Sequence, residues 1–252
     1  MNLEHTSPEP RDVDLRPFLT EAAVESWAGV DALAASLGIE HWAIAGGQMV
    51  MIHLAEHRDS GHRSTADADI VVDVRAGKLE AMAEVAVFLK DSGFTVEFSP
   101  EGVTKFTRGT ARIDLLAPEG LRSQVPTVDG GRAIAAPGTT QALQRAELVA
   151  VTWSDQTTVV RCPTLFSALV AKAAAATGTN ESASRRQRHL DDVVALAAIM
   201  AVTGPGDEQP SKKDRTRIRS AAALLTPGNM AWSATNAPEA AEAILAELAD
   251  NR

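Results

Sequence analysis

The feature that most constrains the fold is a pair of glycines after a short apolar run, followed about twenty residues later by two aspartates on a strand. Gly46 and Gly47 follow the apolar run 43–45 and open a helical pattern, and Asp67 and Asp69 lead directly into the β-branched run 70–72. Side chains two apart on a strand share a face. Both carboxylates are therefore predicted to point the same way at the mouth of that strand.

The chemistry of these groups indicates a site for a cation and a phosphate. Two close carboxylates repel each other unless a cation lies between them, and Mg²⁺ favours such oxygen ligands. Glycines permit a turn that a Cβ would block, and a helix start offers unpaired N–H groups to a phosphate. A third acid, Asp114, lies in the apolar strand 112–116, where burial without a partner is costly and a metal would serve as the partner. This combination predicts a nucleotide enzyme.

The order of these motifs resembles that of a known superfamily. Gly-Gly, then Asp-x-Asp on a strand, then a single Asp on a later strand resembles the DNA polymerase β-like nucleotidyltransferases. The form Gly-Gly…Arg-x-Thr-x-Asp-x-Asp, with Arg63, Thr65, Asp67 and Asp69, resembles the AbiEii branch, the nucleotidyltransferase toxins of bacterial type IV toxin–antitoxin systems. The resemblance covers residues 40 to about 200.

This resemblance implies transfer of a nucleoside monophosphate from a nucleoside triphosphate (NTP) to a hydroxyl acceptor, with release of pyrophosphate. It implies that Asp67 and Asp69 hold two Mg²⁺ ions and that Asp114 binds the ion that activates the attacking hydroxyl. Two ions in such a site stabilise the attacking and leaving oxygens of an in-line displacement. The implied acceptor is tRNA, and the implied protein partner is an antitoxin that neutralises the toxin.

The resemblance also implies a set of nucleotide-binding residues. Lys172 is the only charge between residues 163 and 176; on an apolar helix it either extends to the helix edge or holds a triphosphate, and the resemblance favours the triphosphate. In the family, an acid directly follows a basic residue, and another acid comes three residues after the first one. This chain has His189 instead of the first acid, and Asp192 matches the second acid. The nucleotide-binding residues expected on this basis are Gly46, Gly47, Arg63, Thr65, Lys172 and Asp192.

Two of these residues have simpler interpretations. Arg63 either contacts a nucleotide phosphate or pairs with Asp59 or Asp73, and Thr65 either belongs to the site or shapes the turn with its hydroxyl. Asp73 lies at the far end of the same strand face and is predicted to be structural.

Composition limits the classes of protein. The chain has 252 residues, a net charge of −9 and one cysteine, Cys162, which excludes an internal disulfide and fits a cytoplasmic location. No apolar run is long enough to span a membrane, so no membrane partner is expected. The negative charge disfavours non-specific nucleic-acid binding. Basic residues concentrate in the C-terminal third and form either a solvated helix face or a surface for a polyanion such as RNA: Arg185, Arg186, Arg188, Lys212, Lys213, Arg215, Arg217 and Arg219.

Periodicity predicts an α/β (α+β) fold with a small mixed sheet, covered by helices on one side. Residues 1–160 are expected to form the nucleotidyltransferase core, beginning with a loose arm over residues 1–19, and residues 161–252 a helical part. Strands are predicted at 42–45, 67–72, 95–98, 104–107, 111–116, 147–153 and 157–161. Helices are predicted at 20–37, 47–57, 78–91, 163–176, 184–202, 212–225 and 237–250.

Other functions remain open on the sequence alone. His53 and His57 match the H-x-x-E-H string of zinc peptidases, although His53 also fits the inner face of its helix. Asp-x-Asp occurs in glycosyltransferases, which would not require the upstream glycines. The nucleotidyltransferase pattern is also compatible with an antibiotic-modifying enzyme that acts on a small molecule, or with a non-catalytic relative that only binds.

Overall fold

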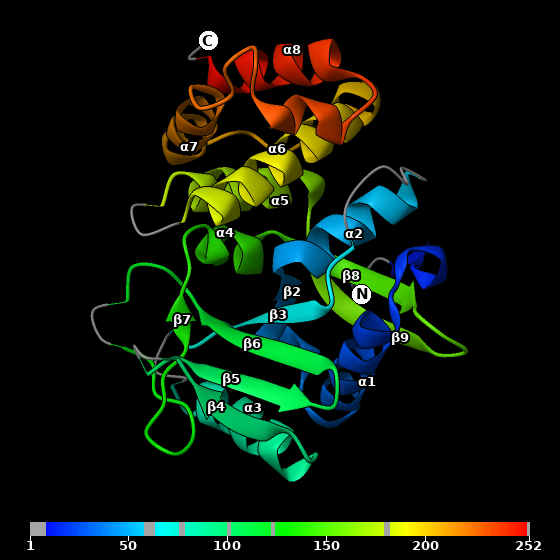
Figure 1. The fold of residues 1–252 in the computed structure, drawn as a ribbon, viewed down its shortest axis with the longest axis vertical. Coiled ribbons are helices and arrows are strands. Elements are labelled where there is room, and N and C mark those ends of the chain that lie inside the picture. Colours follow the sequence, from blue (N-terminus) through cyan, green and yellow to red (C-terminus); the bar gives the residue numbers. More distant parts are fainter. Residues whose placement is uncertain are drawn as a thin grey trace, which may run out of the picture.

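A computed structural model describes residues 9–57, 64–75, 79–99, 102–121, 124–178 and 182–250. It is a mixed α/β structure, as the sequence predicts, with a sheet in one half and stacked helices in the other (Figure 1). No helix in the described ranges is long and apolar enough to cross a membrane. The division into parts at residue 160 stays a prediction.

The larger sheet has the order β2-β3-β6-β5-β4 and is mixed, because β3 pairs parallel with β6 while β2 and β5 pair antiparallel with their neighbours. Helix α1 packs on β3 and β6, and α2 packs on β2 and β3. The strands are β2 (Trp42–Ala45), β3 (Asp67–Val72), β4 (Thr95–Phe98), β5 (Thr104–Arg108) and β6 (Ala111–Ala117). The first helices are α1 (Glu21–Ser36), α2 (Gly46–Glu56) and α3 (Leu79–Asp91).

The burial of alternate residues explains how the sheet presents its acids. In β3, Ala68 and Ile70 are buried while Asp67 and Asp69 are partly exposed, and β6 continues the alternation with Ile113 buried. Apolar side chains of one face thus pack under α1, and the polar side chains of the other face point away from it.

A second, three-stranded sheet corrects the prediction of a loose arm at the N-terminus. Strand β1 (Arg11–Asp14) pairs parallel with β8 (Ala146–Thr152), and β8 pairs antiparallel with β9 (Thr157–Pro163). Val13 and Leu15 are buried. The polar, proline-dotted composition concealed this short strand, whose order comes from pairing with residues far along the chain.

Four helices follow the second sheet. Their bounds are α5 (Leu165–Ala176), α6 (Ala183–Thr203), α7 (Lys212–Ala222) and α8 (Pro238–Ala249). Thr164, Ser182 and Ser211 cap the first three, each accepting a backbone N–H through its hydroxyl. Helices α5 and α6 pack against each other, and α8 packs on α6.

Two short elements, which the sequence did not predict, connect the halves. They are β7 (Ile134–Ala135), parallel to the end of β6, and α4 (Thr139–Gln144). Between them Gly138 has a φ of +83°, and a Cβ there would approach Ala171 Cα of α5 to 2.6 Å. This glycine therefore lets the connection lie directly on α5.

Candidate functional site

The predicted acids come together on adjacent strands. In the parallel pairing of β3 and β6, Asp69 is in register with Asp114, and Asp67 is in register with Arg112. Because residues two apart share a face, all four polar side chains lie on the same side of the sheet. Asp67 and Asp69 point the same way, as predicted.

The two glycines make room for Asp69. Gly46 has a φ of +59°, and a Cβ there would lie 1.6 Å from Asp69 Oδ2. The Gly47 N–H donates a hydrogen bond to the Asp69 carboxylate. The start of α2 therefore already binds a carboxylate of the chain itself, which is a different use from the phosphate cradle that the sequence suggested.

The acids are held in an unfavourable electrostatic arrangement. Burial, reinforced by the negative charges of Asp114 and Asp67, raises the pKa of Asp69 to about 6. Burial and the neighbouring Asp67 also raise the pKa of Asp114, although Arg112 opposes this shift. The protein thus concentrates negative charge that its own residues balance only in part.

Arg112 is the principal cation beside the acids. Its Nη2 lies 3.4 Å from Asp114 Oδ2, and its Nη1 lies 3.8 Å from Asp67 Oδ2. The other oxygen, Asp114 Oδ1, is buried and accepts no hydrogen bond from the described residues. An ionisable oxygen without a donor, next to two further carboxylates, is available to a ligand.

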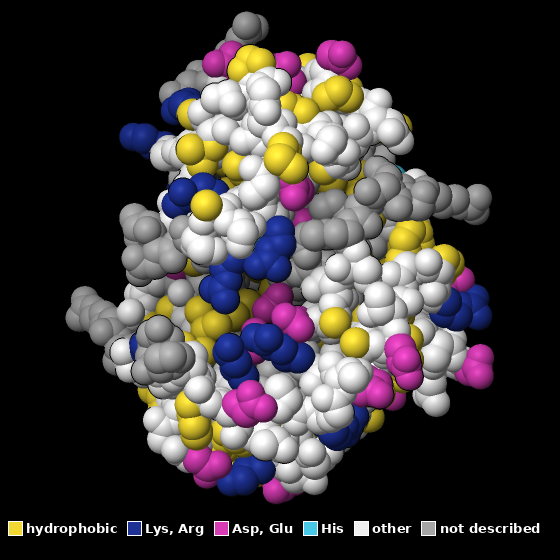
Figure 2. Space-filling model, viewed as in Figure 1, with side chains coloured by type: hydrophobic (Ala, Val, Ile, Leu, Met, Phe, Trp, Pro, Cys, Tyr) yellow, Lys and Arg dark blue, Asp and Glu magenta, His cyan; other side chains and the backbone are white. Residues whose placement is uncertain are grey.

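These acids line a cavity of about 400 Å³ between the sheet and the helices. Gly46, Gly47 and Thr65 line it beside the acids, as the sequence predicted for the site. Figure 2 shows acidic side chains at the centre of a hollow, with basic side chains above and below and apolar ones to the left. The apolar lining includes Leu116, Ile134, Ala136, Pro137 and Ala142.

Lys172 lines this cavity, but Asp192 is not among its lining residues. Lys172 Nζ lies 2.6 Å from Asp192 Oδ2, and the two side chains are almost completely buried. Lys172 also acts electrostatically on Asp69 and lowers its pKa. Asp192 therefore pairs with Lys172 and does not itself line the cavity, and its contact with a nucleotide stays a prediction.

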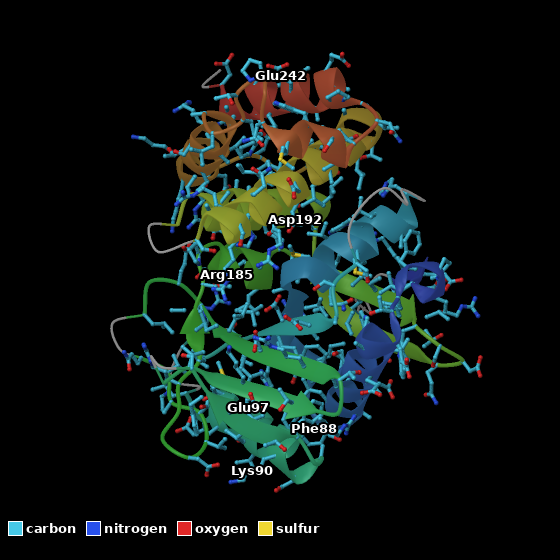
Figure 3. The ribbon with its side chains drawn as sticks, viewed as in Figure 1. Phe88, Lys90, Glu97, Arg185, Asp192 and Glu242 are labelled. Atoms are coloured by element: carbon cyan, nitrogen blue, oxygen red, sulfur yellow. The ribbon has the colours of Figure 1, made fainter. Side chains whose placement is uncertain are left out.

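Arg185 and Arg188 line the cavity, whereas the sequence placed them only among the basic residues of the C-terminal third and not among the site residues. Both lie on the first turns of α6, line the cavity, are exposed, and form no side-chain hydrogen bond or ion pair with the described part of the chain. Figure 3 shows Arg185 between the stacked helices and the larger sheet. Helical spacing could have shown that these two residues share a face.

Most of the other basic residues of the C-terminal third have structural partners. Arg186 donates to the carbonyl oxygens of Ala176 and Gly178 at a helix end. The remaining partners on α7 are Glu119 for Lys213 and Arg217, the Asp250 carbonyl for Arg215, and the Ala249 carbonyl for Arg219. A continuous polyanion surface over these residues is therefore not supported.

The zinc-peptidase interpretation of the H-x-x-E-H string is wrong. His53 is buried, its Nε2 donates to the Pro163 carbonyl at 2.9 Å, and burial lowers its pKa to about 4. His57 Nδ1 donates to the His53 carbonyl, and Glu56 pairs with Arg11. The string is therefore part of the packing of α2.

In the sequence, Arg63, Thr65 and Asp73 flank the strand that carries Asp67 and Asp69. Arg63 lies outside the described residues. Thr65 packs against Gly47, where a Cβ would meet its Cγ2 at 2.6 Å, and its carbonyl accepts from Gln48. Asp73 accepts from the Arg75 backbone and guanidinium, which agrees with its predicted structural role.

The carboxylate oxygens of the site are the type of ligand that Mg²⁺ prefers. Three carboxylates face one cavity, and Asp114 Oδ1 has no donor within the described ranges. Among these same residues, however, no three His, Cys, Asp or Glu side chains already stand at the spacing of a metal site. Asp67, Asp69 and Asp114 are the residues that would hold Mg²⁺ here.

No protein-family model, curated protein or solved structure significantly matches this chain.

Proposed function

We propose that the protein is a metal-dependent nucleotidyltransferase that moves a nucleoside monophosphate from an NTP to a hydroxyl acceptor. The observation that carries this proposal is the convergence of Asp67, Asp69 and Asp114 on one cavity that two arginines without side-chain partners in the described ranges also line. This cavity suits an NTP with Mg²⁺, because its carboxylates can bind the metal ion, its arginines can bind phosphates and its apolar wall can contact the base.

Each wall has a role in this reaction. The acids would bind Mg²⁺, which neutralises charge on the transferring phosphate. Asp114 Oδ1 can accept the proton of the attacking hydroxyl, whose oxygen bonds to the α-phosphorus while the bond to the pyrophosphate oxygen breaks. Lys172 contributes positive charge beside Asp69, and the apolar wall accommodates the nucleobase.

The acceptor and partner come from the motif resemblance to AbiEii toxins. That resemblance supports tRNA as the acceptor and an antitoxin as the neutralising protein. The test is labelled-nucleotide transfer with Mg²⁺, each of the four NTPs and total tRNA, with a parallel set of small hydroxyl compounds. Label on RNA supports the full proposal. Label only on a small compound indicates instead a nucleotidyltransferase of the antibiotic-modifying type. Absence of both transfer and Mg²⁺-dependent NTP binding contradicts the proposed nucleotidyltransferase activity.

Arg185 and Arg188 should hold the β- and γ-phosphates. We expect Arg185→Gln and Arg188→Gln each to weaken NTP binding about tenfold, because each removes a charge-assisted contact to phosphate. Binding of the nucleoside monophosphate should change little, since it lacks those phosphates. Titration calorimetry with both nucleotides measures this difference.

Arg186→Gln is the matched control, because it makes the same change of charge on the same helix away from the cavity lining. Its NTP affinity should stay within about twofold of the wild type. Equal losses in all three variants would indicate a general charge effect and contradict specific phosphate contacts.

A further inference from the structure

The apolar wall of the cavity is built from elements too short to fix themselves. Ile134, Ala136, Pro137 and Ala142 line the cavity, but β7 has two residues and α4 has six. A six-residue helix or a two-residue strand has little stability alone. The position of the wall therefore depends on contacts with the rest of the protein.

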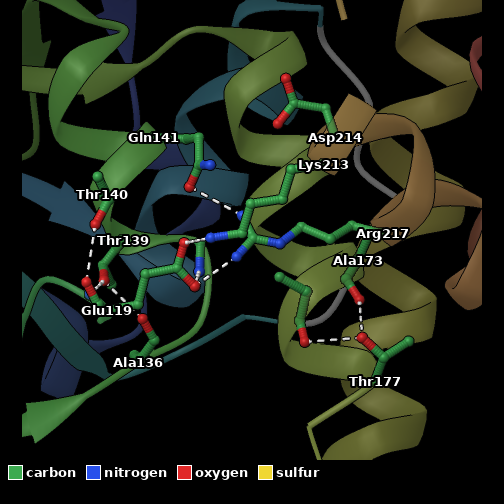
Figure 4. Close-up of polar contacts among 12 residues, drawn as sticks. Glu119, Ala136, Thr139, Thr140, Gln141, Ala173, Thr177, Lys213, Asp214 and Arg217 are labelled. Carbon is green, nitrogen blue, oxygen red and sulfur yellow. Dashed lines mark hydrogen bonds and ion pairs between the residues drawn. The ribbon is translucent and has the colours of Figure 1, made fainter. Parts of the chain in front are cut away.

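Glu119 supplies several of these contacts from just beyond the end of β6 (Figure 4). Its carboxylate accepts the Gly138 N–H at 3.2 Å, and its own N–H donates to Thr139 Oγ1 at 3.1 Å. Thr140 Oγ1 donates to the Glu119 carbonyl at 3.3 Å. Three consecutive wall residues are thus hydrogen-bonded to one glutamate.

The same carboxylate is bound from the other side by α7. Lys213 Nζ donates to Glu119 Oε1 at 2.8 Å, Arg217 donates to Oε2, and Arg217 also donates to Gln141 Oε1 at 2.9 Å. The Arg217 and Glu119 side chains are mostly buried. Against the effect of burial, the hydrogen bonds from Arg217 and Lys213 lower the pKa of Glu119 to about 2, so it is ionised at neutral pH.

We propose that Glu119 is a positioning residue, which fixes the wall 134–142 on α7 and thereby sets how well the cavity accepts a nucleobase. The inference rests on the proposed function for the nucleobase and on the observed contacts for the wall.

The hydrogen bonding of Thr139 strengthens this argument. Its hydroxyl accepts from the Glu119 N–H and donates to the Ala136 carbonyl at 2.6 Å. Thr139 is the one hydroxyl residue of this wall segment that lines the cavity, and its hydrogen atom is already used. Base recognition here depends on the shape of the apolar wall, so a shift of the wall changes affinity directly.

The test is Glu119→Gln in the full chain. Glutamine keeps the size of the side chain but carries no negative charge to pair with Arg217 and Lys213. We expect amide hydrogen exchange over residues 134–142 to accelerate about tenfold. In the transfer assay KM for the NTP should rise about tenfold while kcat stays within about twofold, because the acids are untouched.

Glu97→Gln is the matched control, since Glu97 lies on the edge strand β4, is exposed, and accepts a hydrogen bond from the Thr107 hydroxyl far from the wall (Figure 3). It should leave exchange and KM unchanged. Lys213→Met removes only the exposed ion pair of Glu119, so exchange and KM should change in the same direction but by less. This variant still tests the proposal if Glu119→Gln folds poorly.

Unchanged exchange over 134–142 in both Glu119→Gln and Lys213→Met overturns the proposal. Faster exchange with an NTP KM equal to that of Glu97→Gln also overturns it, because the wall would then not set affinity. If the wild type binds no NTP, the proposed function fails and the nucleobase role fails with it. The exchange measurement then still decides whether Glu119 fixes the wall.

Discussion

Asp69→Asn is expected to lower nucleotide transfer by about a thousandfold while making the metal-free protein more stable at neutral pH. Asparagine keeps the shape of the side chain and can still accept the Gly47 N–H, so the local fold should persist. It removes the charge that Asp114 and Asp67 repel. A gain in stability combined with a loss of activity is typical of a residue retained for function.

The sign of the pH effect follows from the raised pKa of Asp69. An acid with a higher pKa in the folded chain binds its proton more tightly when folded, so its ionisation reduces stability as the pH rises from the ordinary pKa of 3.8 through about 6. The penalty is nearly complete at pH 7 and only a small part of it remains at about pH 3.5. The Asp69→Asn variant, which has no charge to lose or gain at this position, would not carry the penalty.

We therefore expect the free energy of unfolding of Asp69→Asn in EDTA to exceed that of the wild type by about 2 kcal/mol at pH 7, and the difference to become small near pH 3.5. Urea unfolding at the two pH values measures this. Asp73→Asn is the control: Asp73 pairs with Arg75, so this variant should lose up to about 1 kcal/mol.

The two readouts of Asp69→Asn test separate claims. A variant that transfers nucleotide at the wild-type rate would remove Asp69 from the active site. A variant that loses stability at pH 7 would show that the carboxylate is satisfied by its surroundings, and the electrostatic argument for a bound cation would then be wrong.

The sequence predicted the acids better than it predicted their surroundings, for a physical reason. Alternation along a strand places Asp67 and Asp69 on one face with no knowledge of the fold. The pairing of Asp69 with Asp114 depends on parallel register between strands 45 residues apart, which no local pattern encodes. The position of Asp114 inside an apolar strand marked it as a candidate, but only the structure shows that Arg112 lies beside the acids.

The residues that the sequence missed depend on long-range contacts. The wall 134–142 shows no periodicity, because β7 and α4 are short and are held by Glu119 and α7. Strand β1 was hidden for the same reason, since its partner β8 lies more than a hundred residues away. The sequence does not show which basic residues have partners within the protein, so it could not separate Arg185 from the other basic residues.

The buried pair Lys172–Asp192 should show the largest stability effect in the chain. Lys172→Met leaves a fully buried carboxylate without its cation, and breaking such a pair typically costs about 3 to 5 kcal/mol. We expect a loss of this size in urea unfolding at pH 7. Lys90→Met is the matched control, because the Lys90–Asp129 pair is about half exposed and should contribute at most about 1 kcal/mol.

The double variant Lys172→Met/Asp192→Asn separates the structural role of the pair from a role in nucleotide binding. Removing both charges leaves no buried carboxylate that has lost the Lys172 ammonium, so the double variant should recover most of the lost stability. If Lys172 also contacts a triphosphate, this restabilised variant should still bind NTP about tenfold more weakly than the wild type. Full recovery of both stability and NTP affinity would assign Lys172 to the packing of α5 and α6 alone, and Arg185 and Arg188 would then be the cations that hold the phosphates.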